Sequence, residues 1–518
     1  MAYARNQNNT TGYEHPQEAN LHNVHHGMEY NGGGKPVLRV NGWGPSQVSA
    51  FGEPYAVTVT PIVQLDAIFG IDDILQYQRY SALGGTTSAQ DSQYVVSASD
   101  TQYSYAVLRT RRFLRYRPGQ GGLCRFAARF TEGKANTQQR AGFFNQQNAY
   151  QIGYNGTEFG ILHSYGGRTH IQELLITTAP NASQTATITL NGVAHTVSLV
   201  AESTLLTAAR IARTGVFPGW TVEAYDNRVV FLYEGTLGPL AGAFTFASTG
   251  NATATTSTVQ AGVVATNNWI PQSEWNGDLE SAGFTLDPTK FNVYQINFRW
   301  LGAGEIRFSM ENPLTGDFVN LHHIHWSNRN TILHVEQPSF KLGFVAYNLG
   351  GGAVTVWGGS LMMANEGVIQ INTYPRASYV SRSGLAGGTI HHIATVLNPI
   401  TNQGKINTRE VILDELGIAF QGNDPLTVIG YLDATLATGI HQFNSPTDTL
   451  TKASLVEGTF TPNANQPIVA FTLPINGSGK FDLSPYRLIL SPGARFSIAV
   501  LSGQAISQLS ASLIGQAD

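Results

Sequence analysis

A series of short strand patterns joined by tight-turn signals, over residues 125–178, constrains the fold of this sequence most. Asn155-Gly156 is the strongest kind of short hairpin signal, and it separates the strand patterns of residues 150–154 and 159–163. Gly166-Gly167 offers a second turn. Gln, Asn, Ser and His occupy the outward positions far more often than Lys or Glu. The pattern predicts an antiparallel sheet with a neutral polar face.

Residues 179–264 differ from this pattern because they are rich in Thr and Ala and contain a local motif of their own. Asn191-Gly192 and Asp226-Asn227 predict two hairpins, and residues 204–213 carry apolar side chains at helical spacing after a capping Ser203 or Thr204. We therefore predict a small inserted α+β domain of ββαββ order.

The rest of the chain predicts a mainly β protein. Residues 41–178 and 265–370 are expected to form one discontinuous antiparallel β-sandwich of jelly-roll-like type around the insertion. Residues 371–518 are expected to form a second β-sandwich. Residues 1–40 are polar and interrupted by three successive glycines, so they predict an extended arm that gains order along a neighbouring component.

Charged residues make up only 12% of the 518 residues, against about 25% in an average soluble protein. So neutral a surface predicts a subunit that buries much of its outside against copies of itself, with a homotrimer as the favoured state. The net charge of -4 argues against a nucleic-acid partner. No apolar run is long enough to span a membrane, and Cys124 alone cannot form an intramolecular disulfide.

One dense basic cluster follows the early strands. In strand geometry Arg109, Arg111, Arg115 and Arg117 would share one face. We expect an inter-subunit contact there, with carboxylates or backbone carbonyls as partners. The alternative is a site for a phosphate or a sialic-acid-like anion.

Aromatic side chains near Asn, Gln and Asp form a second candidate site. Aromatic faces stack on sugar rings while amides bind hydroxyl groups, so these residues predict contacts with a host-surface glycan or receptor. Subunit interfaces use the same residue types, and that alternative stays open. The candidates are Tyr150, Tyr154, Tyr165, Trp269 and Trp275.

The sequence carries no recognisable catalytic motif. Glu158, Glu274, Asp278 and Asp287 could supply acids for glycosidase chemistry, but nothing marks one pair. The His-rich run at residues 322–325 has no carboxylate at fixed spacing nearby. We expect no enzymatic activity, no cofactor and no metal ion.

Longer motifs carry a family resemblance. The chain contains RYRPGQGGLCRFAARF at residues 115–130, AYQIGYNGTEFGILHSYGGRTHIQELLITT at 149–178 and WIPQSEWNG at 269–277. FTLDPTKFNVYQINFRWLGAGEIRFSMENPLTGDF follows at 284–318. In residue pattern and in order along the chain, these stretches resemble virion structural proteins of tailed bacteriophages of aquatic bacteria. Similar proteins occur in some large DNA viruses. The resemblance covers roughly residues 40–518.

This resemblance implies a β-rich component of a virus particle, of tail, fibre or baseplate type, located in the virion. It supplies no functional residues for this chain. The expected function is a self-assembling structural subunit that residues 1–40 tether to other virion proteins, with a host-surface glycan as a further candidate partner. One alternative is a capsid decoration or head-fibre protein, and a second is a virion-associated polysaccharide depolymerase.

Overall fold

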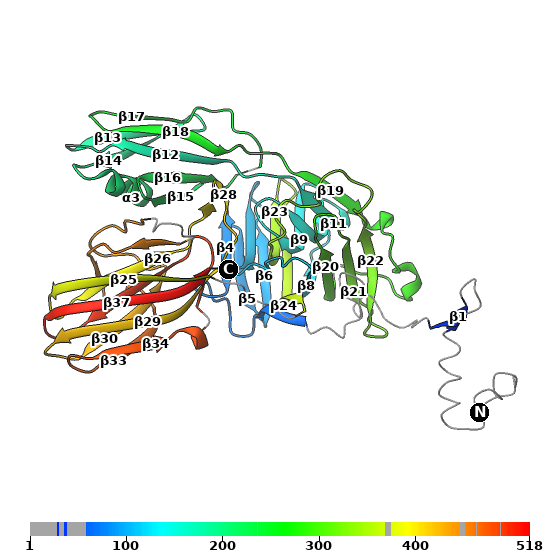
Figure 1. Ribbon diagram of the computed structural model, residues 1–518. Coiled ribbons are helices and arrows are strands. Elements are labelled where there is room, and N and C mark those ends of the chain that lie inside the picture. Colours follow the sequence, from blue (N-terminus) through cyan, green and yellow to red (C-terminus); the bar gives the residue numbers. More distant parts are fainter. Residues whose placement is uncertain are drawn as a thin grey trace, which may run out of the picture.

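The computed structural model describes residues 59–517, except 236, 368–373, 445–450, 463 and 487, and the backbone of β1 (Met28–Tyr30) and β2 (Pro36–Leu38). Apart from this short hairpin, the predicted arm of residues 1–40 lies outside the described residues. The described chain is mainly β, and Figure 1 shows three parts: a central sandwich, an inserted unit and a C-terminal sandwich. No helix in these ranges is long and apolar enough to cross a membrane.

The central part is a sandwich of two antiparallel sheets, and each sheet contains strands from both sides of the insertion. The first sheet has the order β19 (Thr266–Pro271), β11 (Glu158–Tyr165), β10 (Ala149–Asn155), β9 (Thr137–Phe144), β23 (Lys341–Asn348), β7 (Tyr105–Thr110), β4 (Tyr77–Ala82). The second has the order β22 (Phe318–Ile324), β21 (Ile306–Glu311), β20 (Asn292–Arg299), β8 (Gly121–Phe130), β24 (Val354–Glu366), β6 (Gln93–Ala98), β5 (Thr86–Gln90), with β3 (Val59–Leu65) beside β24. Short 3-10 helices follow β19 and precede β20, at η1 (Gln272–Glu274) and η2 (Glu280–Ala282).

The hairpin predicted at Asn155-Gly156 is confirmed. Strands β10 and β11 pair directly across this turn, with Asn155 opposite Glu158. Gly156 has φ +66°, a backbone conformation that favours glycine. Gly153 is needed for a different reason: a Cβ there would lie 1.9 Å from the carbonyl oxygen of Gln139 on β9. Local turn chemistry and close strand packing therefore both depend on glycine in this sheet.

The core lies between the two sheets and is rich in aromatic rings. Tyr294, Ile296 and Phe298 of β20 alternate into it, as their period-two pattern predicts. Phe298 meets Phe143 of the opposite sheet with ring centroids 5.6 Å apart in a T-shaped contact. Such edge-to-face pairs add about 0.5–1.5 kcal/mol beyond the burial of their area. Contacts between aromatic rings therefore hold the two sheets together across the core.

The inserted unit contains a four-stranded sheet with the order β15 (Trp220–Tyr225), β16 (Arg228–Tyr233), β12 (Ile171–Thr178), β18 (Thr253–Gln260). A three-stranded sheet has the order β14 (Val193–Leu199), β13 (Gln184–Leu190), β17 (Thr245–Ser248). The one α-helix of the described residues, α3 (Thr204–Thr214), begins where the sequence predicted it. The Ser203 side chain caps this helix by accepting a hydrogen bond from the Leu206 backbone.

The boundary of the inserted unit differs from the predicted 179–264. Strand β12 pairs with β16 and β18, and its Leu174 and Ile176 belong to the core of the inserted unit. A bridge between Arg168 and Val263 joins the two chain segments at the base. The unit therefore begins near residue 168, because β12 finds its neighbours in the insertion and not in the central sandwich.

The C-terminal part is a second antiparallel sandwich. One sheet has the order β25 (Tyr374–Leu385), β37 (Ile506–Ala517), β29 (Val411–Gly422), β34 (Ser478–Asp482), with β35 (Ile489–Leu490) also on β29. The other has the order β31 (Lys452–Ser454), β26 (Ile390–Leu397), β36 (Arg495–Leu501), β30 (Leu426–Leu432), β33 (Pro467–Leu473), with β32 (Thr459–Phe460) on β26. A small hairpin, β27 (Thr401–Asn402) and β28 (Lys405–Ile406), and the 3-10 helix η3 (Ser484–Tyr486) complete this part.

The inserted unit packs against the C-terminal sandwich, and Figure 1 shows the two parts stacked on one side of the molecule. The backbone N–H of Ile400 donates to the Glu223 carboxylate at 3.0 Å. The backbone N–H of Asp226 donates to the Phe443 carbonyl at 2.7 Å. The central sandwich reaches the same C-terminal part through an ion pair between Arg112 and Glu410 at 3.4 Å. All three parts therefore meet at one junction.

Candidate functional site

The arginines of the predicted basic cluster do not share a strand face. Strand β7 ends at Thr110, so only Arg109 of the four lies in a strand. The N–H of Arg111 still bonds the Gln76 carbonyl next to β4, but the N–H of Phe113 bonds the Glu410 carboxylate of the C-terminal part, so the backbone has left the sheet by residue 113. The four side chains therefore divide: Arg109 and Arg111 line a cavity at the junction, and Arg115 and Arg117 are not among its lining residues.

This junction cavity has a volume of about 240 Å³ and takes walls from all three parts of the chain. The central sandwich contributes polar and cationic side chains from β4, β7 and β23. The inserted unit contributes residues of β15 and β16, and the C-terminal sandwich contributes the loops around 407 and 433. The polar lining includes Gln78, Arg109, Arg111, Lys341, Glu234 and Asp433. The sequence predicted the two arginines as part of a site. It did not predict the other lining residues, because only the fold places them next to these arginines.

Two of the five predicted glycan contacts are core residues. Tyr150 is 0% exposed, and its hydroxyl lies 2.6 Å from Nδ1 of His334 inside the sandwich. Tyr154 is also buried, with its ring centroid 5.0 Å from that of Phe159. Neither ring offers a face to a ligand at the surface. The period-two spacing of Tyr150, Ile152 and Tyr154 was the sequence signal that these side chains share one face of the strand.

The three remaining aromatic candidates are half-buried and do not form one platform. Trp269 packs with the apolar cluster on the outer face of its sheet, and its indole N–H donates to the Glu158 carboxylate at 2.8 Å. Trp275 packs against the core on the other face. Tyr165 contacts the Trp326 ring at 5.2 Å between centroids. The fold therefore spreads these side chains over both faces of the sheet.

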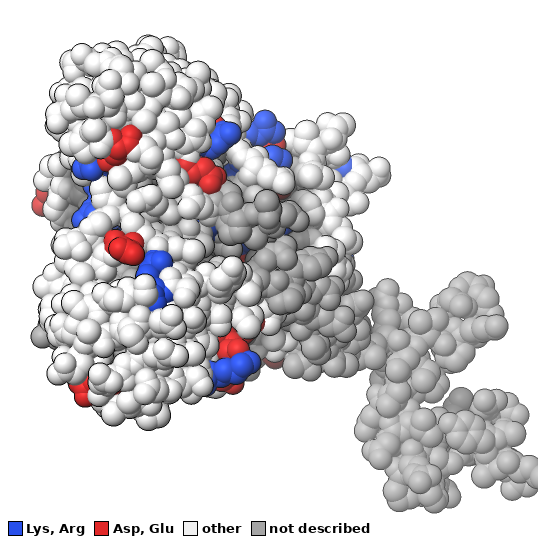
Figure 2. Space-filling model, turned by 60° about the vertical axis from the view of Figure 1, so that its left-hand side comes forward, with Lys and Arg blue, Asp and Glu red and all other residues white. Residues whose placement is uncertain are grey.

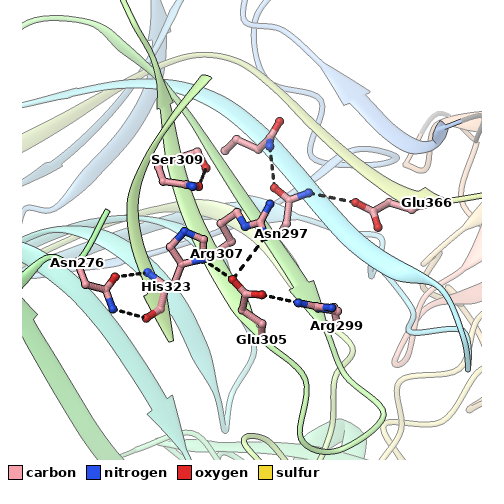
Figure 3. Close-up of polar contacts among 10 residues, drawn as sticks. Asn276, Asn297, Arg299, Glu305, Arg307, Ser309, His323 and Glu366 are labelled. Atoms are coloured by element: carbon pink, nitrogen blue, oxygen red, sulfur yellow. Dashed lines mark hydrogen bonds and ion pairs between the residues drawn. The ribbon is translucent and has the colours of Figure 1, made fainter. Parts of the chain in front are cut away.

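A charged cluster on β20–β22 centres on Glu305 (Figure 3). The carboxylate accepts hydrogen bonds from Arg299 and His323, and Nη2 of Arg307 lies 3.5 Å from it. Partial burial alone would raise the pKa of the Glu305 carboxyl, but His323, Arg307 and Arg299 together lower it to about 2. Asn276 holds the backbone of His323 through two hydrogen bonds. The cluster is a clamp across three strands, in which one carboxylate is shared by two arginines and a histidine.

The histidine run at residues 322–325 joins this clamp. The ring of His323 stacks on that of His325, with centroids 5.7 Å apart, and Nδ1 of His322 accepts the N–H of Asn276 at 3.3 Å. No group of three His, Cys, Asp or Glu side chains in the described part of the chain is placed to hold a metal ion.

Replacing the central carboxylate tests the clamp. Glu305→Gln leaves Arg299 and Arg307 mostly buried without their shared anion, because their side chains are only 26% and 14% exposed. We expect a loss of about 3 kcal/mol in the free energy of unfolding, measured by urea denaturation at pH 7. The exposed carboxylate of Glu336 pairs with Arg168 in solvent, so Glu336→Gln should cost less than about 1 kcal/mol. Equal losses in the two variants would contradict this role for Glu305.

Exposed apolar side chains are the most conspicuous surface feature. Figure 2 shows a face on which Lys, Arg, Asp and Glu are few and scattered. Phe69 is 99% exposed, and Ile68 and Leu75 of the same segment are also exposed. Asp66 and Asp72 accept hydrogen bonds from the backbone on either side of Phe69. The segment between β3 and β4 therefore holds a bare aromatic ring in solvent on a hydrogen-bonded turn.

No protein-family model matches the sequence, and no curated protein matches it. Among solved structures, the chain is similar to a cellulose induced protein, Cip1, at 10% identity and TM-score 0.27, over 60% of this chain and 100% of that one. Lectin II from Ulex europaeus is similar at 7% identity and TM-score 0.21, over 59% and 100%. An archaeal virus protein with a triple jelly roll fold, from a turret assembly, is similar at 8% identity and TM-score 0.16, over 86% and 90%. At such TM-scores these similarities carry no inference about function.

Proposed function

We propose that this chain is a structural subunit of a virus particle that assembles with copies of itself, a trimer being the favoured state. The observation that carries the proposed self-assembly is the bare ring of Phe69, which is 99% exposed. An exposed aromatic ring adds no stability to a protein that remains a monomer in solution. A subunit that packs against its copies would bury it.

The energy available at this position is substantial. Fully burying a Phe side chain stabilises a protein by about 1.5–3 kcal/mol relative to leaving it in water. The Asp66 and Asp72 hydrogen bonds hold the turn before assembly, so less conformational entropy is lost when the ring docks. Large aromatic side chains in such positions commonly carry much of the energy of an interface.

Sedimentation velocity at micromolar concentration tests the assembly. We expect the native chain to sediment as an oligomer, and Phe69→Asp to dissociate at least ten times more readily, since a carboxylate would be forced into an apolar contact. Phe69→Leu is the matched control, because it keeps an apolar side chain and should assemble nearly as well. A native chain that sediments as a monomer overturns the proposed self-assembly.

The virion part of the proposal has a separate test. Particles purified from lysed host cultures should contain the chain in many copies, detected by mass spectrometry of the intact particle proteins. A chain that occurs only in the soluble fraction of the lysate, and never in particles, would contradict the proposed location.

A further inference from the structure

Lys341 is a buried amine in the wall of the junction cavity. Its side chain, at the start of β23, is 4% exposed. The Nζ donates a hydrogen bond to Oε1 of Gln78 at 2.6 Å and lies 4.6 Å from the centre of the Phe113 ring. An ammonium group can donate three hydrogen bonds, and among the described residues Lys341 has this one acceptor. A buried amine keeps its charge only when an anion lies close by.

The same amide oxygen also serves a second cation. Oε1 of Gln78 accepts a hydrogen bond from Nε of Arg109 at 3.2 Å, and Nη2 of Arg109 donates to the Tyr80 hydroxyl at 3.1 Å. In the described part of the chain, neither Lys341 nor Arg109 has a carboxylate within ion-pair distance. Burial, and then the charges of Arg109 and Arg111, lower the pKa of Lys341 well below its usual range. The neutral amide oxygen of Gln78 therefore occupies the position between Lys341 and Arg109 where a carboxylate would be expected.

The carboxylates around the cavity are engaged elsewhere. Asp433 faces Arg111 at 3.4 Å and also accepts the N–H of Arg495. Glu410, behind the wall, pairs with Arg112 and accepts the N–H of Phe113. Glu234 enters from the inserted unit, where one of its oxygens accepts the Thr221 hydroxyl. Each of these acids therefore already has a partner, and among the described residues none of them forms an ion pair with Lys341 or Arg109.

The neutral lining favours a ligand with hydroxyl groups. Gln146 and Gln147 line the cavity, and their side-chain amides have no hydrogen-bond partner among the described residues. At a liquid volume of about 30 Å³ per water, a cavity of about 240 Å³ holds several waters, which is room for a monosaccharide. Glu234 would repel a dianion such as phosphate but can accept a hydrogen bond from a sugar hydroxyl.

We propose that the junction cavity binds a carboxylated monosaccharide, with its carboxylate between Lys341 and Arg109 and its hydroxyls on Gln146, Gln147 and Glu234. The carboxylate supplies the counter-charge that Gln78 cannot provide. The sugar ring lies in the space between the three parts of the chain. This site goes beyond the structural role proposed above, since its geometry is complete within one chain and does not depend on assembly.

Isothermal titration calorimetry with sodium glucuronate tests the ligand class. We expect saturable binding with one site per chain, and binding at least ten times weaker for glucose, which has the same ring without the carboxylate. Acetate and inorganic phosphate should also bind at least ten times more weakly, because they lack the ring. Equal binding of acetate or phosphate would overturn the sugar assignment, and no heat from glucuronate at 10 mM would overturn the site.

Two variants test the residues. Lys341→Met removes the amine while keeping a side chain of similar length, and should weaken glucuronate binding at least ten-fold. Gln78→Glu places a carboxylate beside both Lys341 and Arg109, so it should abolish binding while raising the melting temperature. Lys290→Met is the control, since that side chain is 79% exposed. Retained binding in Gln78→Glu would overturn the proposal, and sedimentation of the same samples shows separately whether assembly is affected.

Discussion

The urea midpoint of this protein is expected to fall steeply as the pH is lowered from 6.5 to 5, before most carboxylates titrate. The cause is a set of buried neutral histidines. His163 and His334 are 0% exposed in the central sandwich, and His392 is 1% exposed in the C-terminal one. Burial lowers the pKa of each from 6.5 to about 4.

The sign follows from proton uptake. Between pH 6.5 and 4 the histidines of the unfolded chain bind protons while the folded ones stay neutral, so the unfolded state gains stability as the pH falls. Each histidine then costs the folded state about 2 kcal/mol by pH 5. Three together cost about 6 kcal/mol, which is comparable to the whole stability of many domains at about 5–15 kcal/mol.

Glutamine variants isolate the effect. His163→Gln and His392→Gln should each have a shallower decline of the urea midpoint with falling pH, whatever their stability at pH 7, because one titrating group is gone. His391→Gln is the matched control, because it makes the same replacement one position away from His392, at a half-exposed histidine. A native protein whose midpoint is constant between pH 6.5 and 5 would contradict the prediction.

Two deletions of nearly the same segment are expected to behave differently. Removing residues 168–263 and joining the ends with a short Gly linker should leave a soluble, folded remainder. Strands β11 and β19 stay paired across the cut, with Tyr165 opposite Thr266. Removing residues 179–264 should give insoluble protein. Strand β12 would remain, but Leu174 and Ile176 would be exposed because the residues that bury them are deleted. Soluble yield, size-exclusion profile and circular dichroism check both.

The larger deletion should still lower the melting temperature. Ile400 and Ile406 of the C-terminal part pack against Val230 and Leu232 of the inserted unit, and the deletion exposes them. Uncovering apolar surface costs about 25 cal/mol per Å². Polar replacements at both isoleucines should recover solubility if any is lost. An unfolded 168–263 deletion would show that the central sandwich cannot form without the insertion.

Much of the local structure was predictable because short-range chemistry decides it. Asn155-Gly156 supplies the positive φ that a tight hairpin requires, and β20 alternates because successive side chains point to opposite faces of a sheet. Ser203 caps α3 as its position before the helical pattern predicted. These features depend on residues within a few positions of one another, so the sequence alone could determine them.

Long-range placement was decided by tertiary structure. The sequence could show that Tyr150 and Tyr154 share a face, but not that a second sheet covers it. Period two distinguishes two faces without saying which one is buried, and strand patterns do not say which neighbour a strand will find, as β12 shows. The cavity is the clearest case: Gln78, Arg109 and Lys341 are far apart in the chain, and only the pairing of β7 with β4 and β23 brings them together.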